Sequence, residues 1–268
     1  MHYDPIKDVI GGVAKKAPFL RKVFYFILGL MFLRTWFVKR ALRNLLSMYH
    51  GPFTLFDAGS GFGQYSYYIA QKFPNATIHA IDVKEDYIDD CRAFFKQAGV
   101  RNVDFAVEDL TVPTHTDRFD FILSVDVMEH IQEDVQVFKN FYGALKEHGT
   151  VLINTPSNLG GSDADSESDE SFIGEHARNG YGADEIKEKL HAAGFSSVNV
   201  RYTYGRFGSV AWRFGIKYPM IMLNKSKIFF AVLPFYYLVS LWFTLMLMWI
   251  DYHSNNTTGT GLLVTAQK

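Results

Sequence analysis

Short apolar runs alternate with stretches of helical composition through the middle of the chain. Runs typical of buried strands fall at residues 53–57, 77–82, 103–108, 119–125, 150–154 and 197–204. Helical stretches lie between them at residues 64–73, 85–98, 128–147 and 184–193. Strands that alternate with helices are typical of βαβ units, which build a parallel sheet. The pattern therefore predicts an α/β fold, and such sheets bind ligands at the carboxyl ends of their strands.

Two longer apolar runs flank this region. Residues 23–33 and residues 228–250 carry no charged side chain, and basic residues border both runs. Aromatic-rich apolar runs with basic borders are typical of membrane-associated segments. As a helix, the second run would reach about 35 Å, enough for a hydrocarbon core of about 30 Å, whereas the first would reach about half that.

Residues 34–48 combine an apolar face with a basic one. At about 100° per residue, one helix face carries Phe37, Val38, Ala41, Leu42, Leu45 and Met48, and the other carries Lys39, Arg40, Arg43 and Ser47. Two interpretations fit this pattern. A helix lying in a lipid headgroup layer has such faces, and so does a helix packed on the protein's own core. The neighbouring apolar run favours the first.

The net charge of −1 hides an uneven distribution. Residues 1–56 hold nine Lys and Arg against two acids, residues 57–188 hold ten against twenty-five, and residues 189–250 hold seven against none. These basic flanks border apolar runs rather than polar surface, which favours a membrane lipid surface as partner and argues against nucleic acid. The single cysteine, Cys91, excludes a disulfide scaffold.

A glycine-rich turn follows the first predicted strand. Asp57 ends that strand, and Gly59, Gly61 and Gly63 follow at alternate positions before a helical stretch begins. Glycines permit a tight turn and let a ligand approach the backbone closely, next to a helix N-terminus. The turn alone would also suit a dinucleotide, so the residues that follow it carry more information.

Acidic residues close the next two predicted strands. Asp82 ends the second strand, where a carboxylate can accept hydrogen bonds from both hydroxyls of a ribose. Glu108 and Asp109 end the third, where an acid can accept a hydrogen bond from an exocyclic amine. A nucleoside-containing ligand at this edge of the sheet is therefore expected.

Together these motifs resemble class I S-adenosylmethionine-dependent methyltransferases. The resemblance covers residues 50–204 and the segment 261–268, which looks like the antiparallel seventh strand of that family. It rests on DAGSGFG at 57–63, Asp82, VEDL at 107–110, FDFILSVDVMEHI at 119–131 and LKEHGTVLINTPS at 145–157. It implies S-adenosylmethionine as the cofactor, with the methionine part at Asp57, Gly59, Gly61 and Gly63, the ribose at Asp82, and the remaining contacts at Glu108, Asp109 (adenine) and Ser124.

The end of the fourth predicted strand should face the reacting methyl group. Asp126, Glu129 and His130 stand there, and the Asn-Pro-Pro-Tyr motif of methyltransferases that act on DNA bases and protein amides is missing. In one interpretation His130, with Asp126 beside it, is a general base for a hydroxyl acceptor. In a second, the three residues resemble the metal site of divalent-cation-dependent quinone and small-RNA 3′-end methyltransferases. In a third, Glu129 and His130 only cap a helix.

We expect one methyltransferase domain with two membrane-associated additions. The first, residues 1–50, precedes the core at 51–205, and the second, residues 206–257, precedes the final core strand at 258–268. Apolar additions beside the acceptor pocket favour methylation of a lipophilic acceptor drawn from the bilayer. O-methylation of a quinone precursor or phenolic lipid is the first hypothesis, and N-methylation of a lipid headgroup amine is the alternative. A soluble enzyme with a homodimer interface and a non-catalytic scaffold are also considered.

The final strand constrains the topology. A single crossing by residues 228–250 would carry residues 261–268 to the far side of the bilayer, where they could not pair with the sheet. We therefore expect this run to enter and leave the same leaflet, or to lie along it, on the cytoplasmic face, with a bend near Pro234. The acidic segment 158–174 is expected to be a lid or a disordered loop in water, with His176 beside it as a substrate-side candidate.

Overall fold

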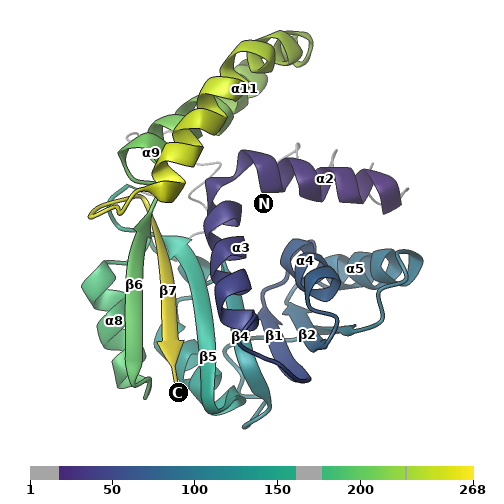
Figure 1. Cartoon of the computed structure of the whole chain (residues 1–268), viewed down its shortest axis with the longest axis vertical. Helices are drawn as coiled ribbons and strands as arrows, with labels where there is room; N and C mark the ends of the chain where they lie inside the picture. The colour runs from purple at the N-terminus through teal and green to yellow at the C-terminus, as the bar shows by residue number, and fades with distance from the viewer. Residues whose placement is uncertain (1–17, 161–176, 227) are drawn as a thin grey trace.

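Seven strands form one sheet in the computed structural model of the chain, which describes residues 18–160, 177–226 and 228–268. The strand order is β3-β2-β1-β4-β5-β7-β6 (Figure 1). β7 runs antiparallel to both of its neighbours, and the other adjacent pairs are parallel. The predicted α/β sheet with an antiparallel last strand is confirmed. The strands are β1 (Phe53–Ala58), β2 (Ala76–Asp82), β3 (Val103–Val107), β4 (Phe119–Val125), β5 (Leu145–Pro156), β6 (Ser197–Thr203) and β7 (Gly261–Gln267).

Helices cover both faces of this sheet. α3, α4 and α5 pack on one face, and α6 and α8 pack on the other. Strands of such a sheet are apolar on both sides, as in β1, where neighbouring Leu55 and Phe56 belong to the cores on opposite faces. The elements of the two layers are α3 (Leu33–Leu46), α4 (Gln64–Lys72), α5 (Glu85–Gln97), the short 3₁₀ turn η1 (Met128–His130), α6 (Asp134–Ala144) and α8 (Ala183–Ala192).

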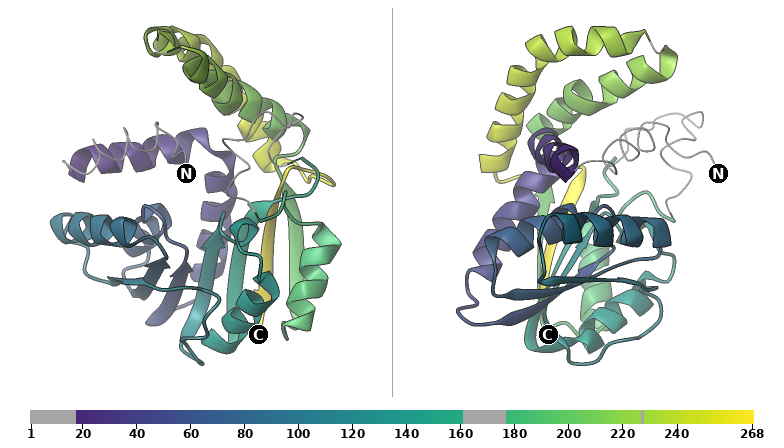
Figure 2. Two further views of the ribbon diagram at one scale, coloured as in Figure 1. Left: turned by 180° about the vertical axis from the view of Figure 1, so that it is seen from behind. Right: turned by 90° about the vertical axis from the view of Figure 1, so that its right-hand side faces the viewer.

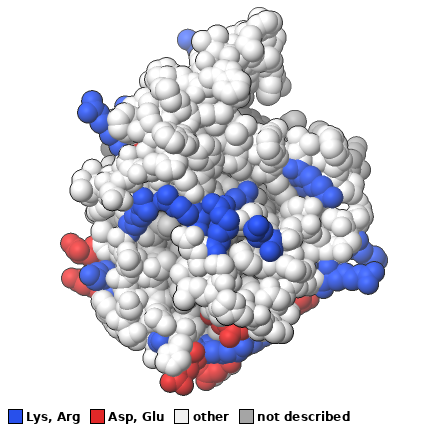
Figure 3. Space-filling model, in the orientation of Figure 1, with Lys and Arg blue, Asp and Glu red and all other residues white. Residues whose placement is uncertain are grey.

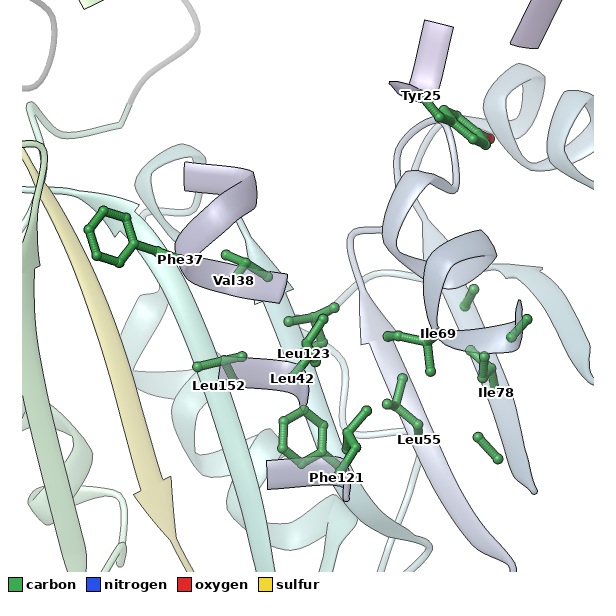
Figure 4. Close-up of a cluster of buried hydrophobic side chains, with 14 of the residues drawn as sticks. Tyr25, Phe37, Val38, Leu42, Leu55, Ile69, Ile78, Phe121, Leu123 and Leu152 are labelled. Carbon is green, nitrogen blue, oxygen red and sulfur yellow. The ribbon is translucent and has the colours of Figure 1, made fainter. Parts of the chain in front are cut away.

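The interpretation of residues 34–48 as a helix in a headgroup layer is wrong, and the alternative is right. α3 is buried against the sheet, with Phe37, Val38 and Leu42 fully inaccessible. Figure 4 shows these side chains beside Leu123 of β4 and Leu152 of β5. An amphipathic pattern shows which helix face is apolar but not what covers it. Here the apolar inner face of the central strands requires a covering helix.

The predicted helix over 128–147 is also corrected. The segment forms η1 and α6, and from Leu145 onward it belongs to β5. Leu145 pairs with Phe119 of β4, and a shift in register follows before Thr150 pairs with Phe121. Pairing with a neighbouring strand is a tertiary contact, and it overrides the local helical composition of these residues.

A helical hairpin lies between β6 and β7. It consists of α9 (Arg206–Trp212), the π-helical turn η2 (Arg213–Lys217), α10 (Tyr218–Lys225) and α11 (Phe229–His253). The chain leaves the sheet along α9 and α10 and returns along α11 (Figure 2). At the same end of the sheet, α2 (Pro18–Met31) precedes α3 (Figure 1).

The helix does not break at Pro234, because α11 is continuous through that residue. Proline at this position removes one backbone hydrogen bond near the start of a 25-residue helix, and the rest of the helix retains its own. The chain instead reverses direction between α10 and α11. The segment 158–174 and His176 lie largely or wholly outside the described residues, so those expectations stay predictions.

Candidate active site

The glycine turn after β1 adopts the backbone geometry that its sequence requires. Gly59, Gly61 and Gly63 have φ angles of +89°, +51° and +73°, a region that side chains disfavour. A methyl group added at Gly59 would also lie only 2.3 Å from Cγ2 of Val127. The turn therefore leaves its backbone open beside the N-terminus of α4.

Three buried polar atoms around this turn have no hydrogen-bond partner among the residues that the structure describes. They are Ser60 Oγ, Gln64 Nε2 and Ser124 Oγ. A buried polar atom without a partner costs about 1–3 kcal/mol, so such atoms usually mark a place where a ligand or water supplies the missing bond. Ser124 was expected at this site, whereas Ser60 and Gln64 were not. Both flank the predicted glycines, which is the signal that could have found them.

Asp57 lies beneath the turn and is shielded from solvent. Its carboxylate is 2% exposed and accepts a hydrogen bond of 2.5 Å from Ser66 Oγ. Burial, together with the charge of Asp82, raises the pKa of Asp57 to about 6, although the bond from Ser66 opposes the shift. A buried carboxylate with no positively charged partner in the described residues favours a cationic group of a ligand close by.

The acids at the ends of β2 and β3 are placed differently from one another. Asp82 accepts bonds of 3.0 Å from the backbone N–H groups of Gly61 and Lys84, so it fixes the turn on the ligand side. Asp109 is exposed and accepts two bonds from Thr111, one from its N–H and one from its hydroxyl. Glu108 points elsewhere and contacts histidine side chains. The structure therefore brings Asp57, Asp82 and the glycines together, with Asp109 at the edge.

α2 holds the glycine turn from outside, a role the sequence did not reveal. The backbone carbonyl of Phe62 accepts a bond of 2.7 Å from Arg21 Nη2 and a second, short bond from the hydroxyl of Tyr25. Arg21 also pairs with Asp90 of α5. Arg21 was interpreted only as a basic border of an apolar run, because nothing local connects it to a turn forty residues away.

A pocket of about 200 Å³ opens at the carboxyl ends of β4, β5 and β6, the same edge of the sheet at which the glycine turn follows β1. Three separate regions of the chain form it: the ends of these strands with the start of β7, the α2–α3 junction, and the first turns of the hairpin. The lining residues are Phe32, Arg34, Asp126, Asn154, Thr155, Pro156, Leu159, Gly160, Thr203, Tyr204, Ser209, Trp212, Arg213, Thr260 and Gly261. Its position suits the group that receives the methyl.

Charged residues of both signs meet in this pocket. Arg34 pairs with Asp126, which has a left-handed φ of +53°, and the N–H of Arg34 donates a bond of 3.1 Å to the hydroxyl of Tyr204. Behind Asp126, buried Glu129 accepts a bond from Thr155. Burial and the charge of Asp126 raise the pKa of Glu129 well above its usual range, which favours its neutral form. Asp126 is the carboxylate that lines the pocket itself.

His130 is separated from this pocket. It is exposed at the end of η1 and is not among the lining residues. Asp126, Glu129 and His130 also do not bring three ligand atoms within 4.8 Å of one another, as a shared metal would require. The geometry gives the metal interpretation no support. Glu129 does not cap a helix, because its carboxylate accepts a bond from Thr155 of β5. The roles of His130 as base or as part of a helix cap stay predictions.

Pocket residues outside the strands were missed from the sequence. Arg34 borders the run 23–33 and Phe32 lies inside it, so both were interpreted as parts of a membrane-associated segment. Trp212 was placed only within the insertion 206–257. An isolated arginine between an apolar run and an amphipathic helix was the one available signal.

The sheet order, the glycine turn and the acids at the ends of β1 and β2 define the class I fold of S-adenosylmethionine-dependent methyltransferases. A family model described as a methyltransferase domain matches residues 52–194. The chain belongs to this methyltransferase family, and its cofactor is S-adenosylmethionine. The partnerless polar atoms and open glycine backbone fit that cofactor.

Similar proteins act on different acceptors. The chain is 31% identical to maize phosphoethanolamine N-methyltransferase 1 over 159 residues, which is 58% of this chain and 30% of that protein. It is 30% identical to malonyl-[acyl-carrier protein] O-methyltransferase 2 of Ilyobacter polytropus over 38% of this chain and 39% of that protein. The chain thus spans only about a third of the length of these curated relatives.

A solved structure shows the same fold. Phosphoethanolamine N-methyltransferase 2 of Haemonchus contortus, in complex with S-adenosyl-L-methionine, superimposes with a TM-score of 0.62 at 20% identity. The match covers 87% of this chain and 52% of that chain.

Cofactor affinity is expected to depend on pH through Asp57. The ionised carboxylate is the form that can hold the ammonium group of the methionine part. With a pKa of about 6, cofactor binding must displace a proton at lower pH, so affinity should fall about tenfold per unit below pH 6 and stay flat above it. Calorimetric titration between about pH 5 and pH 8 measures this. The Asp57→Asn variant should bind more weakly with a flat profile, and a flat wild-type profile would contradict the role of Asp57.

The raised pKa of Asp57 also affects folding stability, which changes with pH in the opposite direction to cofactor affinity. Because folding raises the pKa of Asp57 above its unfolded value near 4, the folded chain holds this proton more tightly. The contribution of Asp57 to stability is therefore greatest at low pH and is lost as the pH rises from about 4 to about 6.

Proposed function

We propose that the chain transfers the methyl group of S-adenosylmethionine to the amine of a lipid headgroup at a membrane surface. The observation that carries the proposal is the acceptor pocket, which joins charged and aromatic residues beneath helices with exposed apolar faces. The maize and Haemonchus relatives are named for phosphoethanolamine, which is the polar head of a common phospholipid.

The pocket offers a partner for each part of such a headgroup. Asp126 can hold an ammonium group, and the guanidinium of Arg34 suits a phosphate, which it can bind through two parallel hydrogen bonds. Phe32, Tyr204 and Trp212 place aromatic rings around the same space. Aromatic rings bind methylated ammonium groups through cation–π attraction, worth about 0.5–2 kcal/mol. This combination favours an amine that gains methyl groups over a phenol.

The transfer itself needs little covalent assistance. The amine lone pair forms the new N–C bond as the C–S bond breaks in line, and the sulfur keeps the electron pair, leaving S-adenosylhomocysteine. The proton on nitrogen departs to water or to Asp126. Positioning supplies most of the rate enhancement in such a reaction, and residues that orient the amine therefore matter most.

Exposed apolar side chains lie on the helices that follow β6 and precede α3. On α11, Phe235, Leu238, Val239 and Trp242 are 71–79% exposed, and only 11% of the most apolar stretch of this helix is buried. Other exposed apolar side chains lie on α2 and on the outgoing arm of the hairpin: Phe19, Phe26, Phe207, Phe214 and Ile221. An exposed apolar surface of this extent is typical of a membrane or protein contact.

The hairpin is suited to one leaflet. α11 is the helix of the described chain that is long and apolar enough to cross a bilayer. Its last part packs on the domain, where Thr244, Leu247 and Met248 are buried. The remaining stretch of about 15 residues reaches only about 22 Å, less than a hydrocarbon core of about 30 Å. The two ends of the insertion also meet, since Thr203 of β6 pairs with Gly261 of β7.

Basic side chains lie where headgroups would be. Figure 3 shows Lys and Arg gathered in a band across the middle of one face, below an upper part with few charges. α3 and β6 supply basic residues beside the base of α11, where Arg40 and Arg201 donate to backbone carbonyls of Tyr252 and Ser254. Near an anionic membrane, each such residue contributes about 1 kcal/mol of attraction.

Labelled cofactor identifies the acceptor. The chain is incubated with methyl-labelled S-adenosylmethionine and vesicles containing phosphatidylethanolamine, with free phosphoethanolamine and with a total lipid extract, and the products are identified by mass spectrometry. We expect N-methylated phosphatidylethanolamine. Label found only in N-methylated free phosphoethanolamine would refute a membrane-bound acceptor. Label in a methyl ether of a quinone or phenolic lipid would establish O-methylation instead.

Membrane topology is tested separately. In cells, both a tag at Met1 and a tag at Lys268 should be digested by protease added to inverted vesicles and protected in intact cells, because the protein lies on the cytoplasmic face. Protection of the Lys268 tag in inverted vesicles would mean a true crossing and would contradict the pairing of β7. Soluble protein after a simple wash, with a dimeric mass, would show that the apolar helices form a homodimer interface.

A further inference from the structure

Two histidines and a glutamate lie close together near β2 and β3, on the face of the sheet opposite α3. Nε2 of His79 lies 2.8 Å from one carboxylate oxygen of Glu108, and Nε2 of His115 lies 3.0 Å from the other. These ligand atoms all lie within 4.8 Å of one another. They come from β2, from the end of β3 and from the loop before β4, three places that only the fold brings together.

The donor set is one that divalent transition metals prefer. Two imidazole nitrogens and one carboxylate are a known zinc-binding set with a fourth position open to water. A further carboxylate supports one of these imidazoles, because Nδ1 of His79 lies 3.1 Å from the carboxylate of Asp104. A carboxylate in that position fixes the tautomer that leaves Nε2 free to bind a metal.

The cluster is shielded but reachable. The side chains of His79, His115 and Glu108 are 9%, 10% and 17% exposed. The rings of Phe56 and Phe119 stack against His79 and limit its movement. Residues held this way need only small shifts to move from hydrogen-bonding distances to the slightly wider spacing of ligands around one ion.

We infer that His79, Glu108 and His115 form a binding site for a divalent transition metal such as Zn²⁺, outside the methyl-transfer site. The metal would join β2 to the loop that follows β3. That loop begins with Asp109, which is expected to contact adenine, so the ion would fix the backbone on one side of the cofactor. The inference is independent of the acceptor proposed above.

One neighbour opposes the metal and provides a sharp test. Nη1 of Arg118 lies 3.0 Å from Nδ1 of His115. Arginine can only donate, so Nδ1 of His115 accepts and its proton sits on Nε2, the atom that would bind the metal. Metal binding must reverse this tautomer and displace the guanidinium. Removing the Arg118 side chain, which is exposed, should therefore tighten metal binding.

Calorimetric titration of the full chain with ZnCl₂ tests the site. The protein carries no polyhistidine tag, and it is first stripped with EDTA and dialysed into metal-free buffer. We expect one Zn²⁺ per chain, binding at least a hundredfold weaker in His115→Asn, and tighter binding in Arg118→Gln. Asp104→Asn should weaken binding about tenfold. Because the Asp104 side chain is 78% exposed, this variant keeps the fold even where changes at His79 do not.

The matched control is His148→Asn, at a side chain that is 81% exposed and is not one of the clustered ligand residues. It should bind Zn²⁺ like the wild type, and Mg²⁺ should not bind measurably. With Co²⁺ as the probe, the wild type should show the intense visible absorption of a four-coordinate ion. Less than one equivalent of bound Zn²⁺, or equal affinity in the wild type and His115→Asn, would overturn the assignment.

Discussion

Replacing Asp82 with alanine is expected to weaken S-adenosylmethionine binding about a hundredfold or more. The carboxylate is the expected acceptor for two ribose hydroxyls, and charge-assisted hydrogen bonds are worth about 1.5–3 kcal/mol each. The change also leaves the N–H groups of Gly61 and Lys84 without their acceptor, which loosens the turn that contacts the cofactor. Calorimetric titration with the cofactor measures the loss.

Asp89→Ala is the control for this experiment. Asp89 is an exposed acid of the same region, on α5, where it pairs with Arg92. Its loss should leave both cofactor affinity and thermal unfolding unchanged, whereas Asp82→Ala should also unfold at a somewhat lower temperature, because two backbone N–H groups lose their acceptor. Equal cofactor affinity in Asp82→Ala and the wild type would remove Asp82 from the site.

The second large effect is expected at Arg34. In Arg34→Met, Asp126 loses its ion-pair partner and the acceptor loses the guanidinium that is proposed to bind its phosphate. A charge-assisted hydrogen bond of this kind is worth about 1.5–3 kcal/mol. The specificity constant kcat/KM for the acceptor should fall about thirtyfold to a hundredfold. Arg34→Lys should recover part of it, since it restores the charge without the planar fork.

Cofactor affinity separates a role in the pocket from general damage. Arg34 lines the acceptor pocket rather than the glycine turn, so Arg34→Met should bind S-adenosylmethionine within about threefold of the wild type. Arg101→Met, at an exposed arginine between α5 and β3, is the control and should change neither parameter. A loss of cofactor affinity as large as the loss of kcat/KM would show that Arg34 supports the fold of the site as a whole.

The sequence predicted the features that depend on local pattern. Buried strands, the glycine turn and the acid after each of the first strands are encoded by neighbouring residues, and the structure brings Asp57, Gly59 and Asp82 together. The last strand was predicted from its resemblance to a known family, and its antiparallel pairing with β5 and β6 confirms it.

Features that depend on distant contacts could not be predicted in the same way. The apolar face of α3 would suit a membrane as well as a sheet. The structure shows that it covers the apolar face of β4 and β5, which the helix sequence alone does not reveal. The meeting of His79, Glu108 and His115 depends on the register of β2 with β3, which no residue spacing encodes. The reversal between α10 and α11 was not predicted, because the run 228–250 was considered without the helix that pairs with it in the hairpin.

α2 faces in two directions. On its inner side, Arg21 and Tyr25 hold the carbonyl of Phe62 in the glycine turn, and on its outer side Phe19 and Phe26 are exposed. Any surface that binds the outer side and favours this position of the helix must also change the affinity of the turn for its ligand. Linkage makes the effect reciprocal, so the cofactor must change the affinity for that surface by the same factor. The time the protein spends at such a surface would then follow the concentration of S-adenosylmethionine in the surrounding solution.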